Sequence, residues 1–253
     1  MAGYLRLQLD LVRATWRERF APLRDNVPPP RLRHRVHGSI DHRGYLEVGQ
    51  RSWRSIEQLL EEIGRPADTF DSILDYGCGS GRVARVIPKN TSRGPRTITA
   101  IDIDATAIAW CARHLPGIQF LAVPPNPPTP LPDAAFDLIF AVSVFTHLDE
   151  TMQFAILDEM RRLLRPDGVL VASVQGDYHR RLRKRQFDLS RGFTFVASDR
   201  GWFKKDGLPR FYQDAQHTRG YVERTWSATM DVRLYRERGI CDYQDAVVLV
   251  RRP

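Results

Sequence analysis

Two carboxylates and a glycine-rich turn form the pattern in this chain that is best suited to chemistry. Asp75 ends an apolar run and precedes the turn Gly77-Cys78-Gly79-Ser80-Gly81, whose glycines can take positive φ and let a ligand approach the backbone. Asp102 ends the next apolar run. It follows the glycine turn by about twenty residues, which is where a carboxylate can accept hydrogen bonds from ribose hydroxyls. This spacing predicts a site for a ligand that contains a nucleoside.

The spacing of the glycines distinguishes two kinds of nucleotide site. Dinucleotide-binding proteins use G-x-G-x-x-G, whereas Gly77, Gly79 and Gly81 follow G-x-G-x-G, with Asp75 two places before the first. The chain resembles the class I S-adenosylmethionine-dependent methyltransferases of the bacterial small-molecule type, whose motif D-x-G-x-G-x-G it matches in full. The resemblance continues through residues 136–148 and 161–170 and covers residues 51–175 well. A Rossmann-like enzyme that binds another nucleotide is the alternative.

The resemblance implies roles for the residues around the turn. Gly77 and Gly79 would shape it around the methionine part of S-adenosylmethionine, and Asp75 would order that part by hydrogen bonding. Asp102 would take the ribose hydroxyls and Ile103 would pack against adenine. Cys78 is interpreted as a small side chain packed beneath the cofactor rather than as a nucleophile. The predicted cofactor-binding residues are Asp75, Gly77, Cys78, Gly79, Asp102, Ile103, Asn126 and Ser143.

Asn126 belongs to this set because the chain lacks an acidic residue just after the third predicted strand. Many relatives carry an Asp just after the third strand that accepts from the adenine amino group, and this chain has Ala122 and Val123 there. Asn126 or the backbone would then supply the contact. The segment Pro124-Pro125-Asn126-Pro127-Pro128 is superficially similar to the Asn-Pro-Pro-aromatic signature of amino-directed DNA methyltransferases. No aromatic follows it and it precedes the fourth strand, so it is interpreted as a rigid loop beside the adenine.

Methyl transfer from a sulfonium is an in-line displacement that, for many acceptors, also requires removal of a proton. His147 follows the fourth strand, where the carboxyl ends of strands meet the ligand, and is the first candidate for a general base. Packing or a hydrogen bond to the backbone is the competing interpretation. Tyr178, His179 and His217 are weaker candidates, expected to be a half-buried tyrosine and two surface histidines. No metal site is predicted.

Apolar runs alternate with helical patterns over most of the chain, which predicts an α/β fold. The expected fold is a doubly wound, mostly parallel seven-stranded sheet with an antiparallel last strand, covered by helices on both faces. Two C-terminal strands would be joined by a short link through Gly239. The predicted strands are 72–76, 97–102, 118–123, 136–142, 168–175, 231–235 and 245–250, and the predicted helices between them are 82–88, 105–114 and 150–164.

A helical extension is predicted at the N-terminus. Its apolar residues recur at helical spacing, and a run of prolines, Pro28-Pro29-Pro30, would end it. A second helix, centred on Trp53 and Ile56, would end near Gly64. Residues 1–50 are therefore predicted to be an N-terminal extension or lid, and residues 51–253 the Rossmann-like domain, with a substrate-side insert at 176–216. The apolar positions of the extension are Leu5, Leu9, Val12, Trp16, Phe20 and Leu23.

The net charge of +8 is concentrated in two pieces of the chain. Residues 1–35 and residues 179–191 each carry a net charge of +5, so the remainder is close to neutral. Nucleic-acid binding is one interpretation of such patches, and a solvated arginine-rich surface is the other. Three cysteines without a C-x-x-C pair indicate neither a disulfide framework nor a zinc site. No membrane span is predicted, and the expected location is cytoplasmic.

The sequence therefore favours S-adenosylmethionine-dependent methyl transfer to a small-molecule acceptor, such as a secondary metabolite or a glycan precursor. An RNA methyltransferase is the alternative enzyme, and an inactive cofactor-binding partner protein is the alternative of another class. The insert would form an aromatic and basic lid or pocket wall, and the oligomeric state stays open. The aromatic residues of the insert are Phe187, Phe193, Phe195, Trp202, Phe203, Phe211 and Tyr212.

Overall fold

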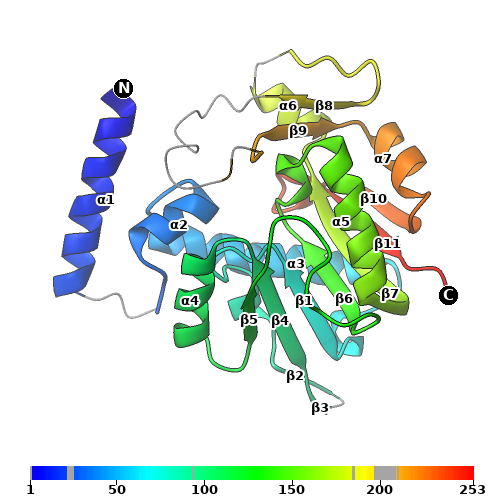
Figure 1. Cartoon of the computed structure of the whole chain (residues 1–253), viewed down its shortest axis with the longest axis horizontal. Helices are drawn as coiled ribbons and strands as arrows, with labels where there is room; N and C mark the ends of the chain where they lie inside the picture. The colour runs from blue at the N-terminus through cyan, green and yellow to red at the C-terminus, as the bar shows by residue number, and fades with distance from the viewer. Residues whose placement is uncertain (1, 22–25, 93, 184–185, 197–208, 210) are drawn as a thin grey trace.

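The structure is a computed structural model of the chain, and it describes residues 2–21, 26–92, 94–183, 186–196, 209 and 211–253. A seven-stranded sheet forms its centre, in the order β10-β11-β7-β6-β1-β4-β5 (Figure 1). Strands β7, β6, β1, β4 and β5 pair in parallel, and β11 is antiparallel to both of its neighbours. The predicted sheet with an antiparallel last strand is confirmed. The strands are β1 (Ser72–Tyr76), β4 (Thr97–Asp102), β5 (Gln119–Ala122), β6 (Phe136–Ala141), β7 (Leu164–Val174), β10 (Asp231–Ile240) and β11 (Gln244–Val250).

The apolar strands are buried because helices cover both faces of the sheet. Successive strand residues point to opposite faces, so Ile73 packs on the side of α3 (His42–Glu62) and Leu74 on the side of α5 (Glu150–Leu163) and α7 (Arg219–Trp226). Figure 1 shows α3 behind the sheet and α5 in front of it. The parallel register sets Asp75 opposite Ala100, so β1 and β4 end at the same edge.

Asp residues cap the N-termini of three helices. Asp41 accepts hydrogen bonds from two backbone N–H groups of α3, and Asp104 does the same for α4 (Ala105–His114). Asp149 accepts from Met152 N at 2.8 Å at the start of α5. Each cap satisfies donors that a helix leaves unpaired, and Asp104 fixes the start of α4 directly after β4.

A prediction that was wrong is the helix over residues 82–88. The structure has a single 3₁₀ turn there, η2 (Ala84–Val86). Ile87 takes extended dihedral angles, φ −66° and ψ 127°, because the following Pro88 disfavours the α conformation of the residue before it. The link through Gly239 was also placed wrongly: Gly239 lies inside β10, and the turn is formed by Cys241 and Asp242 at positive φ.

The N-terminal region contains a helix that the sequence did not predict. After α1 (Ala2–Phe20), the chain begins α2 (Pro30–His37) with Pro30 at its first turn, where the missing N–H of proline costs nothing. The helix predicted around Trp53 begins at His42, so it crosses the predicted boundary between residues 50 and 51. Leu23 lies outside the described residues.

The insert after β7 forms a small layer of its own. It contains α6 (Asp177–Arg183), β8 (Phe193–Val196) and β9 (Asp214–His217), and the two strands pair antiparallel. These elements lie together at one end of the sheet (Figure 1). Trp202 and Phe203 lie outside the described residues. A second strand pair, β2 (Asn90–Thr91) and β3 (Gly94–Pro95), forms a hairpin before β4.

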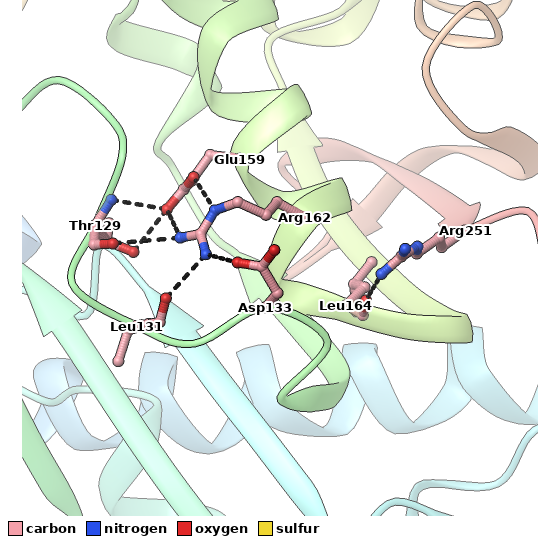
Figure 2. A network of polar contacts seen from close by, with 7 residues as sticks. All are labelled: Thr129, Leu131, Asp133, Glu159, Arg162, Leu164 and Arg251. Carbon is pink, nitrogen blue, oxygen red and sulfur yellow. Dashed lines mark hydrogen bonds and ion pairs between the residues drawn. The ribbon is translucent and has the colours of Figure 1, made fainter.

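A polar network fixes the loop between β5 and β6 to α5 (Figure 2). Glu159 Oε1 accepts from Thr129 N at 2.8 Å, from Thr129 Oγ1 at 2.6 Å and from Arg162 at 2.7 Å. Arg162 also donates to the Leu131 carbonyl at 2.9 Å and pairs with Asp133. Burial alone would raise the pKa of Glu159, but the hydrogen bonds from Arg162 and Thr129 outweigh it and lower the pKa. The start of this loop lines the cavity described below.

Candidate functional site

A cavity of about 490 Å³ lies at the carboxyl edge of the sheet. Its floor is formed by the ends of β1, β4 and β6, and the loop after β5 contributes Val123, Pro124 and Pro125. On the other side α2 lines it through Leu32, Arg35 and Val36. The cavity therefore lies between the parallel sheet, where such folds bind ligands, and the N-terminal extension.

The glycine turn lines this cavity, and its glycines are closely packed against neighbouring side chains. Gly77 N and Cys78 N both donate to the Ile101 carbonyl, at 2.8 and 2.9 Å, which holds the turn against the end of β4. Gly77 and Gly79 have φ of 79° and 55°. A Cβ on Gly77 would lie 2.5 Å from Val144, and one on Gly79 would lie 2.6 Å from Val36. Glycine is needed at both positions for the dihedral angle and for the space.

Asp102 connects the turn to the start of α4. Its Oδ2 accepts from Gly79 N at 2.7 Å and its Oδ1 accepts from Asp104 N at 2.8 Å. Burial raises the pKa of Asp102, and the backbone hydrogen bonds oppose that shift. Each carboxylate oxygen can accept a second hydrogen bond, so Asp102 can still bind hydroxyl groups in the cavity.

Asp75 is the buried carboxylate of the site, with 3 % of its surface exposed. Burial, and then the charge of Asp102, raise the pKa of Asp75 to about 8, although the backbone N–H of Ala84 lowers it. Its Oδ2 has no hydrogen-bond partner among the described residues. A buried acceptor without a donor is costly, and a cationic or hydrogen-donating ligand in the cavity would satisfy it.

Of the other residues predicted to bind the cofactor, some line the cavity and one does not. Ile103 lines the cavity and is 37 % exposed, as an apolar contact for a planar group would be. Asn126 does not line the cavity, and Pro124 and Pro125 of the same loop do. Cys78 lines the cavity, and burial raises the pKa of its thiol well above the ordinary value, which suits a packed side chain better than a nucleophile.

Ser143 lies just beyond β6 at a φ of 63°, which is unusual for a residue with a side chain. Its N–H donates to Ser173 Oγ at 2.7 Å, and both serine hydroxyls donate to Gln244 Oε1, at 3.0 and 2.8 Å. The segment after β6 is joined in this way to β7 and β11. The hydrogen bonds hold the strained backbone of Ser143 in place.

A second cavity, of about 260 Å³, adjoins the first. It lies between α2, α3, α6 and β9, and its polar residues include Gln175, Asp214 and Gln244. Six residues line both cavities, so the two cavities are adjacent. The shared lining residues are Arg35, Val36, Arg82, Val142, Ser143 and Tyr212.

Two arginines that line both cavities were not predicted from the sequence. Arg35 pairs with Asp104 at 2.6 Å and so ties α2 to the start of α4. Arg82 donates to the Val36 carbonyl at 3.2 Å, and burial lowers its pKa. Its Nε has no hydrogen-bond partner among the described residues. The one signal in the sequence was the position of Arg82 directly after the glycine turn.

The candidate bases occupy three different environments. His147, in η3 (Phe145–His147), lines the second cavity, stacks on Tyr212 at 3.8 Å between ring centroids, and donates from Nδ1 to the Gln213 carbonyl at 2.7 Å. That bond makes Nε2 the acceptor nitrogen of the neutral ring. His179 also lines the second cavity, with 1 % of its surface exposed. Tyr178 lines neither cavity and packs under Arg238, 4.4 Å from its ring centre.

His217 belongs to the core and lines neither cavity. It is fully buried, and its Nε2 donates to Gln153 Oε1 at 3.0 Å. Burial lowers the pKa of His217 to about 3. The expectation that His179 and His217 are surface residues was wrong for both, because His179 packs against Tyr243 and His217 against Phe193 and Trp226. No metal-binding cluster occurs among the residues that the structure describes.

Comparison with known proteins agrees with this geometry. The profile of the methyltransferase domain family matches residues 74–172. The chain carries a class I S-adenosylmethionine-dependent methyltransferase domain. The match spans β1 through most of β7 and includes the glycine turn, Asp102 and Ser143.

The relatives of this methyltransferase domain have varied substrates. The chain is 30 % identical over 121 residues to a Mycobacterium tuberculosis protein named a probable S-adenosylmethionine-dependent methyltransferase, covering 48 % of this chain and 42 % of that protein. It is 29 % identical over 126 residues to the malonyl-[acyl-carrier protein] O-methyltransferase of Enterobacter lignolyticus, covering 50 % and 47 %. The chain thus spans about half the length of the curated relatives that it matches.

Solved structures share the fold of this chain. The Burkholderia thailandensis 1,6-didemethyltoxoflavin-N1-methyltransferase, solved with 1,6-didemethyltoxoflavin and S-adenosylhomocysteine, has a TM-score of 0.54 at 17 % identity and covers 80 % of this chain and 79 % of its own. The PH0226 protein of Pyrococcus horikoshii has a TM-score of 0.57 at 14 % identity, covering 82 % and 95 %. No described helix is long and apolar enough to cross a membrane.

Proposed function

We propose that this chain transfers a methyl group from S-adenosylmethionine, bound in the 490 Å³ cavity, to a small molecule bound in the adjoining 260 Å³ cavity. The residues that line both cavities carry this proposal, because adjacent cavities would bring the sulfonium and the acceptor atom close enough for the in-line contact that methyl transfer requires. The second cavity has the size of a small organic ligand and is closed on one side by α2.

The residues of the first cavity fit the cofactor. Asp75 offers an unsatisfied buried acceptor for the amino-acid part, and Asp102 has acceptor capacity left for the ribose hydroxyls. Ile103 offers an apolar contact for the adenine, and Pro124 and Pro125 border the same space. The bound cofactor would supply a methyl group on an already activated sulfonium. This chain's own residues would orient the two ligands and exclude water.

His147 is the residue best placed to remove a proton from the acceptor. The Gln213 carbonyl and the Tyr212 ring fix the orientation of the imidazole at the second cavity. The neutral ring would accept the proton on Nε2. Tyr178 and His217 line neither cavity, and this argues against their acting as the base.

The ion pairs of two arginines in the insert favour a small acceptor over RNA. Arg180 pairs with Asp177 and donates to the His217 carbonyl at 2.7 Å, and Arg181 pairs with Glu237 at 3.1 Å. Arginines that are already paired offer less to a phosphate backbone. The side chains of Arg183, Lys184 and Arg185 lie outside the described residues.

A turnover assay on fractionated cell extract tests the proposal. The protein and S-adenosylmethionine are incubated separately with the small-metabolite, RNA and protein fractions, and S-adenosylhomocysteine formation is measured. We expect turnover with the metabolite fraction, a product heavier by one methylene group in mass spectrometry, and a loss of rate in His147→Gln. Turnover with the RNA or protein fraction alone would contradict the small-molecule acceptor and leave the methyltransferase domain unaffected.

A further inference from the structure

Helix α1 presents an apolar stripe to solvent. Five large side chains recur at helical spacing and are all at least half exposed. At 100° per residue they occupy a stripe roughly 80° wide and about 22 Å long. Their exposed fractions are 61 % for Leu5, 57 % for Leu9, 51 % for Val12, 58 % for Trp16 and 76 % for Phe20.

The opposite side of α1 is fixed to α2, so the stripe faces away from the protein. Leu11 is 2 % exposed, and Glu18 pairs with the buried Arg33 at 2.5 Å. Gln8 accepts from Arg31 of α2 at 3.0 Å. Figure 1 places α1 at the rim of the molecule, with α2 between it and the sheet. The stripe is therefore not a face that closes on the cavities.

Arginines border the stripe on both sides. Arg6, Arg13 and Arg17 follow one edge and Arg19 lies at the other, and all four are exposed. None of them forms an ion pair with a described residue. Apolar side chains bordered by unpaired cations are typical of helices that lie in the interface of a membrane.

We propose that α1 docks on an anionic membrane surface, with the apolar stripe at the boundary of headgroups and acyl chains and the arginines at lipid phosphates. The positive charges of the arginines favour an anionic membrane over a second copy of the chain. Pairing the same stripe with that of a second copy would place arginines opposite arginines, whereas an anionic surface attracts them. Trp16 and Phe20, stacked at 5.8 Å, supply the aromatic contact that interfacial helices use.

Vesicle co-sedimentation of the full chain tests the proposal. Vesicles of phosphatidylcholine are compared with vesicles that also contain phosphatidylglycerol. We expect the protein to bind the anionic vesicles and to be released by salt. Leu9→Gln with Trp16→Gln, and separately Arg13→Gln with Arg17→Gln, should each weaken binding by about tenfold or more.

Leu182→Gln is the matched control, because Leu182 of α6 is 51 % exposed and lies outside α1. It should bind vesicles as the wild type does. Affinity for S-adenosylhomocysteine should be unchanged in every variant, which verifies the fold independently of methyl transfer. Equal binding to neutral vesicles, or no vesicle binding, would overturn the proposal. So would a wild-type dimer, seen by light scattering, that the Leu9 and Trp16 changes dissociate.

Discussion

Asp102 performs two tasks with one side chain, because it orders the glycine turn and faces the cavity. In Asp102→Asn one oxygen becomes an amide nitrogen, which cannot accept from Gly79 N or Asp104 N. We expect the affinity for S-adenosylhomocysteine to fall by about 10- to 100-fold, since a lost hydrogen bond of this kind costs about 1–3 kcal/mol. Isothermal titration calorimetry measures the change.

Asp137→Asn is the matched control for that experiment. Asp137 also accepts two backbone hydrogen bonds, from Asp71 N at 2.9 Å and Ser72 N at 3.0 Å, but at the opposite end of β1. This variant should lose stability and keep its affinity for S-adenosylhomocysteine. If Asp102→Asn bound the ligand as tightly as the wild type does, the proposed role of Asp102 would be wrong.

The raised pKa of Asp75 predicts a pH-dependent affinity. Its carboxyl is protonated in the free protein below a pH of about 8, and an ammonium ligand requires it ionised. Ionisation costs about 1.4 kcal/mol for each pH unit below the pKa. Affinity for S-adenosylhomocysteine should therefore rise by up to about tenfold per unit from pH 6 to pH 8. Asp75→Asn should bind more weakly with a flat profile, and parallel profiles for the two proteins would contradict this role.

Among the elements, α5 holds the loop whose first residues line the 490 Å³ cavity. Glu159→Gln removes the charge at the centre of the network in Figure 2. We expect a loss of about 1.5–3 kcal/mol in the free energy of unfolding at neutral pH. The folded pKa of Glu159 is lowered, so its contribution is complete above the unfolded pKa and is lost as pH falls through the folded pKa. Urea unfolding at neutral and acidic pH measures both effects.

Glu237→Gln is the control for the network. Glu237 pairs with Arg181 at 3.1 Å on an exposed surface, where such pairs contribute little. Its change in stability should stay within about 0.5 kcal/mol. A Glu159→Gln variant that is as stable as Glu237→Gln would show that the network does not fix the loop.

At the scale of the whole molecule, His217 makes the fold sensitive to acid. Its pKa is about 3 in the folded protein and ordinary in the unfolded chain, so between pH 6.5 and about 3 the unfolded state binds the extra proton. The free energy of unfolding should fall as pH falls through this window, with up to about 1.4 kcal/mol per pH unit due to His217. His217→Gln keeps a donor for Gln153 and should flatten this part of the curve. Identical slopes in the two proteins would contradict the assignment.

Some features of the site could be predicted from sequence because neighbours along the chain create them. The glycine turn begins two residues after Asp75, and the spacing of its glycines indicates which kind of nucleotide site it forms. Asp102 comes to the same edge because parallel strands of alternating βα units must end together. The sheet was predictable for the same reason, since apolar runs and helical periods are local patterns.

Local patterns gave wrong predictions where a single neighbouring residue decides the conformation of the backbone. Residues 82–88 have a helical pattern, and Pro88 prevents the helix. The proline run before α2 was interpreted as the end of a helix, although Pro30 begins one. In the first case the ring of Pro88 restricts the residue before it, and in the second the fixed φ of Pro30 suits the first turn of a helix.

The tertiary structure alone decided which distant side chains meet. Arg35, Arg82 and Tyr212 come from separate parts of the chain, and each of them lines both cavities. His217 is in the core and His147 is at the second cavity, although a surface position was predicted for His217. Burial and cavity walls depend on contacts between elements far apart in the chain, and the sequence records each element but not the packing that brings them together.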